Sequence, residues 1–140
     1  MQTIDPRKQR EIMDFVGKIF ARKFDVVVEE WIKTFTNEED ALKPKKVKMH
    51  RFFQQLTPEN QSLVMSMIRA TAFTAYTFFL LEAQQFDAAG QDGIGLTARY
   101  EAEVYPDLAE ISDGLGGEIM QEYGWLGRFS KYYHPEDEEW

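Results

Sequence analysis

The feature that most constrains the fold of this chain is a long apolar segment at residues 63–81, L-V-M-S-M-I-R-A-T-A-F-T-A-Y-T-F-F-L-L. Thr57, Pro58 and Glu59 precede it. Threonine can cap a helix, proline suits its first position, and glutamate in the first turn suits its dipole. We therefore predict a helix over 57–86. Because it is apolar on nearly every side, this helix either lies in a protein core or spans a membrane.

Arg69 lies in the middle of this segment and decides between those two environments. An arginine at the centre of a bilayer costs about 2.5–3.5 kcal/mol even on the scale derived from insertion experiments. We therefore expect a central core helix and no membrane partner. An isolated buried charge is strongly unfavourable, so Arg69 is expected to form a buried ion pair with another segment or to extend to the surface. The functional alternative is an anion site at Arg69, with Tyr76 as a neighbour.

Residues 5–35 are predicted to form a second long helix. Asp5 can cap it, and Pro6 then takes the first helical position, where its missing N–H costs nothing. Apolar residues recur in steps of three and four along the whole segment, which is the pattern of one buried stripe. The β-branched run at 26–28 indicates a strand more weakly, and a break near Asp25 stays open.

The remaining segments are shorter. We predict a polar loop over 36–46, a short helix over 47–56 and a glycine-rich break over 87–95. Residues 96–105 alternate as a strand does but also repeat every four residues, and their Ala and Glu content favours a helix slightly. A β-hairpin within 95–112 is the alternative. In the short helix, the residues expected to point inward are Val47, Phe52, Phe53 and Leu56.

Length and composition favour one domain. A chain of 140 residues with 44% hydrophobic residues, including eleven Phe, can bury a core of its own. We predict a single all-α domain over 1–135, a bundle of about four to five helices around the helix at 57–86. The acidic residues of the 136–140 tail are expected to be mobile. There is no cysteine, which excludes disulfides and thiolate chemistry, and no signal peptide is recognisable, so we expect a cytoplasmic protein.

Two glycine clusters invite a ligand-loop interpretation, which their surroundings disfavour. G-Q-D-G-I-G at 90–95 and D-G-L-G-G-E at 113–118 lack the Lys and Ser/Thr of a phosphate loop, and the second has acidic flanks. The first also fails the ligand spacing of a calcium loop. Glycines at helix boundaries are the better interpretation. The glycines expected to shape a short C-terminal helix are Gly114, Gly116, Gly117, Gly124 and Gly127.

The sequence offers no catalytic or metal-binding constellation. His50 and His134 are far apart and are not paired at metal-ligand spacing, so both are expected at the surface. There is no G-x-S-x-G motif. The many acidic pairs fit solvated faces, because Asp and Glu are seldom fully buried. We therefore predict no catalytic residue, no metal and no cofactor.

The net charge of −8 disfavours nucleic acid, because phosphate backbones repel an acidic chain. The run K-P-K-K-V-K-M-H-R at 43–51 has five positive residues and is the one local exception. We expect it to be a solvated loop, with nucleic-acid or anionic-lipid contact as the alternative. The acidic E-E-D at 38–40 lies beside it.

These observations favour a small acidic non-enzymatic binding protein, such as an inhibitor or immunity-type protein that neutralises a basic protein partner. The alternatives are a helical small-molecule-binding protein or enzyme with an anion site at Arg69, and a nucleic-acid-associated protein that uses 43–51. Self-association is compatible with any of them. The candidate partner-binding residues, chosen for interface-rich types or acidity, are Trp125, Arg128, Tyr132, Glu38, Glu39 and Asp40.

Overall fold

The computed structural model describes residues 4–85 and 92–138 of the chain. It is mostly helical with one small β-hairpin, which confirms the predicted fold class. The elements are α1 (Pro6–Thr36), η1 (Glu39–Ala41), α2 (Pro44–Gln54), α3 (Pro58–Gln84), β1 (Ala98–Tyr100), β2 (Glu103–Tyr105), η2 (Leu108–Glu110), α4 (Leu115–Glu118), α5 (Trp125–Phe129) and η3 (Pro135–Glu138).

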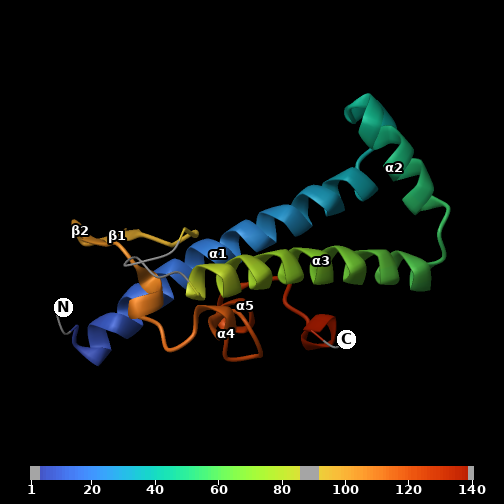
Figure 1. Cartoon of the computed structure of the whole chain (residues 1–140). Helices are drawn as coiled ribbons and strands as arrows, with labels where there is room; N and C mark the ends of the chain where they lie inside the picture. The colour runs from blue at the N-terminus through green and yellow to red at the C-terminus, as the bar shows by residue number, and fades with distance from the viewer. Residues whose placement is uncertain (1–3, 86–91, 139–140) are drawn as a thin grey trace.

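Two long helices, α1 and α3, set the shape of the molecule (Figure 1). They diverge from the end where α1 begins and α3 ends, and α2 lies across the open end between them. The hairpin lies beside the first half of α1, and the short helices α4 and α5 lie beneath α3. The fold is therefore packed at one end and open at the other.

The helix boundaries follow local chemistry. The Asp5 carboxylate accepts from the Arg7 N–H at 3.1 Å, and the Thr57 hydroxyl accepts from the Asn60 N–H at 3.2 Å, so both predicted caps are confirmed. Helix α1 is continuous through Asp25, because its helical period outweighs the β-branched run that follows. Helix α2 starts at Pro44, earlier than predicted, since proline suits a first helical position.

Close approach at two glycines brings the C-terminal helices onto the long ones. A Cβ on Gly17 of α1 would lie 2.3 Å from the Cδ1 atom of Trp125, whose side chain is 0% exposed. A Cβ on Gly116 of α4 would lie 2.3 Å from the Cδ2 atom of Leu81 on α3. These contacts account for Gly17 and Gly116 by packing.

The hairpin interpretation holds for residues 98–105, and the slight preference for a helix there is wrong. Strands β1 and β2 pair antiparallel, with Ala98 opposite Tyr105. The two turn residues have φ of 50° at Glu101 and 67° at Ala102, the conformation that favours Asn-Gly in two-residue hairpins. A Glu-Ala turn gives no such indication in the sequence. The two-residue turn puts Ala98, Tyr100 and Tyr105 on one face of the hairpin, and Val104 on the other is 53% exposed. The hairpin is held by this face, because Tyr105 is buried and the Tyr100 ring lies 5.2 Å from that of Phe15.

The predicted core helix α3 is buried unevenly. Its buried residues all lie in its second half: Phe73, Thr77, Leu80 and Ala83. Only 17% of its most apolar 18-residue window is buried. By length and composition α3 could also cross a membrane, a test that core helices of soluble proteins pass as well. Its first half therefore leaves apolar surface uncovered.

The tail predicted to be mobile is instead docked as far as it is described. Asp137 in η3 is 7% exposed. The Glu138 carboxylate accepts from the Gln121 N–H at 2.8 Å and from the Tyr133 hydroxyl at 2.7 Å. Glu139 and Trp140 lie outside the described residues, as do 86–91 of the predicted helix end and glycine-rich break.

Candidate functional site, an open apolar groove

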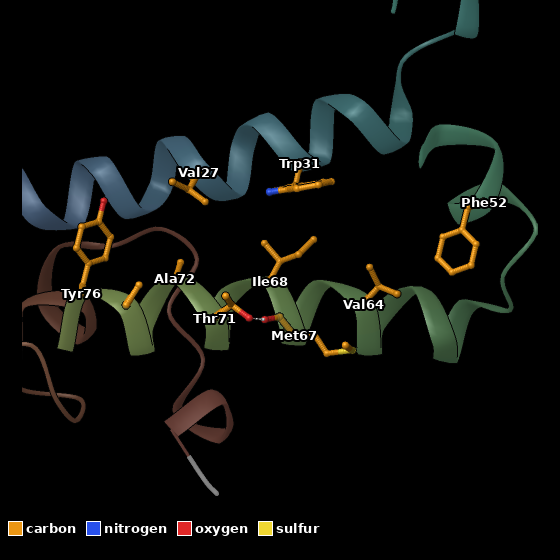
Figure 2. Close-up of a pocket in the computed structure, with 10 residues that line it drawn as sticks. Val27, Trp31, Phe52, Val64, Met67, Ile68, Thr71, Ala72 and Tyr76 are labelled. Atoms are coloured by element: carbon orange, nitrogen blue, oxygen red, sulfur yellow. Dashed lines mark hydrogen bonds between the residues drawn. The ribbon is translucent and has the colours of Figure 1, made fainter. Parts of the chain in front are cut away.

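A groove of about 760 Å³ opens between α1, α2 and α3 (Figure 2). No charged side chain lines it, and its only hydroxyls come from Thr71 and Tyr76. This volume lies within the range of about 300–1,000 Å³ that is typical of binding sites. The lining residues are Val27, Trp31, Phe52, Val64, Met67, Ile68, Thr71, Ala72, Ala75 and Tyr76.

Each wall of the groove comes from helical spacing. Val27 and Trp31 are four residues apart on α1, and Val64 and Ile68 are four apart on α3, so each pair shares one face of its helix. Figure 2 shows the two pairs pointing toward one another across the gap, with Phe52 of α2 at the open end. Several of these side chains lie in solvent: Val27 is 37% exposed, Phe52 58% and Met67 61%.

Phe52 was predicted to point into the core, and this is wrong. Its neighbour Phe53 takes the core position, is 8% exposed and stacks on Phe35 with ring centroids 4.1 Å apart. A step of one residue rotates a side chain by about 100° around the helix axis, and this turns Phe52 away from the contact that Phe53 makes with Phe35. Phe52 is therefore left at the groove.

Hydrogen bonds in the C-terminal half of α2 connect it to both long helices. His50 Nδ1 lies 3.1 Å from the Thr34 carbonyl of α1, to which it donates, and Gln54 donates to the carbonyl of Phe35. In the same half of α2, the Phe53 carbonyl accepts from Gln61 Nε2 of α3 at 3.0 Å. His50 is 9% exposed, so its predicted surface position is wrong. Helix α2 thus acts as a fixed spacer between α1 and α3.

The groove offers little polar chemistry. The Thr71 hydroxyl donates to the Met67 carbonyl of its own helix at 2.7 Å, which leaves it satisfied. Burial raises the pKa of the Tyr76 phenol, so that group stays neutral in ordinary buffers. Tyr76 also makes an edge contact with Phe20, with ring centroids 5.6 Å apart. The groove can therefore bind a ligand mainly through contacts with the apolar surface of that ligand.

No protein-family model, curated protein or solved structure matches the chain. The geometry of its sites therefore carries the functional argument alone.

Arg69 forms the predicted buried ion pair. Its Nε atom lies 2.6 Å from Oδ2 of Asp137, and the Ser66 hydroxyl donates to Oδ1 of the same carboxylate at 2.5 Å. The side chains of Arg69 and Asp137 are 13% and 6% exposed. The hollow beside them measures about 10 Å³, room for one water at most. The geometry therefore favours the ion pair over the anion site.

The C-terminal candidate residues do not form one exposed patch. Trp125 is fully buried, because its indole fills the space beside Gly17, so it presents no surface to a partner. Arg128 Nη2 donates to Asp14 at 3.0 Å, and the Tyr132 hydroxyl donates to Glu29 at 3.3 Å. Burial and then the charge of Glu29 raise the pKa of Tyr132. Arg128 and Tyr132 thus have acidic partners on α1.

The acidic candidates lie at η1, between α1 and α2. Arg51 binds Glu39 through two contacts, Nε to Oε1 at 2.9 Å and Nη2 to Oε2 at 3.0 Å. The hydrogen bond from Arg51 holds the pKa of the Glu39 carboxyl below its usual value. Glu38 and Asp40 remain exposed. Part of the acidic cluster is therefore compensated by the basic run of the same chain.

Metal binding gains no support from the described residues, among which no group of three or more His, Asp or Glu could hold an ion. His134 lies at the surface as predicted, with Nδ1 3.2 Å from Glu136. Sequence reasoning missed the groove itself. One sequence pattern did indicate it. The helix at 57–86 is apolar on nearly every side, and the two helices before it have only one apolar face each, which is too little to cover it.

Proposed function

We propose that the protein is a non-enzymatic binding protein that holds an apolar helix of a protein partner in the groove between α1, α2 and α3. The observation that carries this proposal is the uncharged lining, whose large side chains remain 37–61% exposed at Val27, Phe52 and Met67. Contiguous apolar surface of this kind marks sites of protein or membrane interaction. Full burial of such a side chain is worth about 1.5–3 kcal/mol.

A helix suits this groove better than a small polar molecule does. Small-molecule sites have a few convergent polar groups that fix orientation. In this groove the Thr71 hydroxyl is bound within its own helix, and the other polar side-chain groups of the lining are the Tyr76 phenol and the Trp31 indole N–H. The two long helices, held apart by α2, leave a groove between them in which the side-chain ridges of another helix can pack.

A basic protein partner is a separate expectation, which rests on the charge of the chain and not on the groove. Residues 101–122 have seven Asp or Glu and no Lys or Arg, an acidic surface that would steer a basic protein toward the chain. An inhibitor or immunity-type role would follow if the partner's own function is blocked. The two alternative functions have less support, because Arg69 is bound by Asp137, and Arg51 and Lys46 of the basic run are bound by Glu39 and Glu30.

Photo-crosslinking tests the groove directly. The photo-reactive residue p-benzoylphenylalanine placed at Val27 should crosslink to an apolar helical segment of a protein, identified by mass spectrometry of the joined peptides. The matched control places it at Tyr123, which is 74% exposed and away from the groove. The proposal fails if position 27 gives no protein crosslink, or if both positions give the same one.

A further inference from the structure

Helix α3 has a free apolar stripe that extends beyond the groove. Val64, Ile68, Thr71, Ala75 and Phe78 follow one another in steps of four and three, the spacing of a helix–helix seam. Phe78 is 67% exposed and lies outside the groove lining. The face that packs on the core is a different one, with Phe73, Thr77 and Leu80. A seam on the free side of α3 calls for another helix of matching length.

Resting on the proposed function, we infer that the helix bound in the groove is α3 of a second copy of this chain, packed antiparallel around Thr71. A two-fold axis at Thr71 places Val64 opposite Phe78 of the second copy. It places Met67 opposite Ala75, so a large side chain meets a small one on both sides of the axis. The same axis places Ile68 opposite Thr74, so at all these positions the free face of α3 meets uncharged residues of the reversed copy.

Charge selects the same orientation. The segment 38–51, which contains η1 and most of α2, has five Lys or Arg against three Asp or Glu, and it precedes the N-terminal end of α3. Lys46 and Arg51 form ion pairs within the chain, whereas Lys43, Lys45 and Lys48 are exposed. Residues 101–122, with seven Asp or Glu and no Lys or Arg, belong to the region around the other end of α3. An antiparallel pair brings the basic end of each copy toward the acidic end of the other, whereas a parallel pair brings like charges together.

The arrangement also covers the groove. Each α3 would lie between α1 and α3 of the other copy, so that Val27 and Trp31 gain a partner. The two copies of α1 and α3 then form a four-helix core, in which small residues such as Thr71 and Ala75 let the central pair approach closely. A single copy leaves this surface in water.

Sedimentation velocity of the full chain tests the association. We expect a dimer for the natural sequence, a monomer for Phe78→Glu and a dimer for the control Tyr123→Glu, which alters an equally exposed aromatic residue away from the stripe. Phe78 does not line the groove, so this variant leaves the site of the proposed function intact. A natural chain that stays monomeric, or a Phe78→Glu chain that stays dimeric, overturns the inference.

Single cysteines test the orientation, because the chain has none of its own. Thr71→Cys should form a disulfide-linked dimer under mild oxidation. Val64→Cys alone should not, since 14 residues of helix separate position 64 from position 78 and place the two copies of position 64 about 21 Å apart. Mixing Val64→Cys with Phe78→Cys should restore the link. Self-linking of Val64→Cys would establish a parallel pair and refute the antiparallel one.

The outcomes also separate this inference from the proposed function. A monomer that crosslinks from position 27 to a different protein leaves the proposed function standing and overturns the second copy as occupant. A monomer that floats with vesicles containing phosphatidylglycerol, and crosslinks to no protein, would make the free face of α3 a membrane face. That result overturns both.

Discussion

Replacing Arg69 by Leu should destabilise the fold by about 3–5 kcal/mol, the usual cost of removing one partner from a buried ion pair. The size follows from the environment. The side chains of Arg69 and Asp137 are 13% and 6% exposed, so little water is present to screen the charges. Without the guanidinium, the Asp137 carboxylate keeps only the hydrogen bond from Ser66 as a side-chain partner among the described residues.

Urea unfolding at neutral pH, followed by circular dichroism, measures this cost. For a chain of this length the expected loss corresponds to a fall in Tm of roughly 10–17 °C. The double variant Arg69→Leu/Asp137→Leu should be more stable than Arg69→Leu, because no unpaired charge stays buried. Arg51→Leu is the matched control: its pair with Glu39 is 62% and 40% exposed and should be worth less than about 1 kcal/mol. Equal losses for Arg69→Leu and Arg51→Leu would refute the reasoning.

Three further predictions concern packing, capping and pH. Gly17→Ala should cost about 1–3 kcal/mol, seen as a lower Tm, because its Cβ would lie 2.3 Å from the Trp125 ring; an unchanged Tm contradicts that contact. Thr57→Ala removes the N-cap of α3 and should lower the free energy of unfolding by about 1 kcal/mol, measured as a lower urea midpoint. Burial and a hydrogen bond to Glu138 raise the pKa of Tyr133. The neutral Tyr133 phenol therefore contributes fully to the free energy of unfolding below the unfolded-state pKa of about 10, and this contribution is lost as pH rises toward the pKa of the folded state. Urea midpoints at pH 9 and 11 should differ less in Tyr133→Phe than in the natural chain, and an equal difference would exclude this role.

The helices could be predicted because their information is local. Thr57 and Pro58 mark the start of α3, and Asp5 and Pro6 that of α1, through side chains within three residues of the backbone groups they serve. The ion pair of Arg69 was predictable in kind, because a charge in an apolar helix needs a partner. Its identity was not, since Asp137 lies 68 residues away in the sequence.

Other features depend on tertiary contacts that leave no local pattern. The hairpin turn has Glu101 and Ala102 at positive φ, where sequence statistics favour Asn and Gly. Residues 136–138 have the composition of a solvated tail, yet Asp137 is buried because Arg69 and Ser66 bind it. His50 lies within a basic run and has no local sign of burial, because its hydrogen-bond partner, the Thr34 carbonyl, comes from the end of α1.

The groove depends both on a local sequence pattern and on tertiary contacts. Sequence alone establishes that α3 is apolar on nearly every side, but the chain supplies cover mainly for its second half, through α1 and α4. Collapse of α1 onto the first half of α3 would require breaking the hydrogen bonds of His50 and Gln61, which connect the C-terminal half of α2 to α1 and to α3. Because a buried donor left unpaired costs about 1–3 kcal/mol, the open geometry is stabilised against closure from within. This geometry supports our proposal that another molecule covers the first half of α3, with a second copy of the chain as the best-matched source.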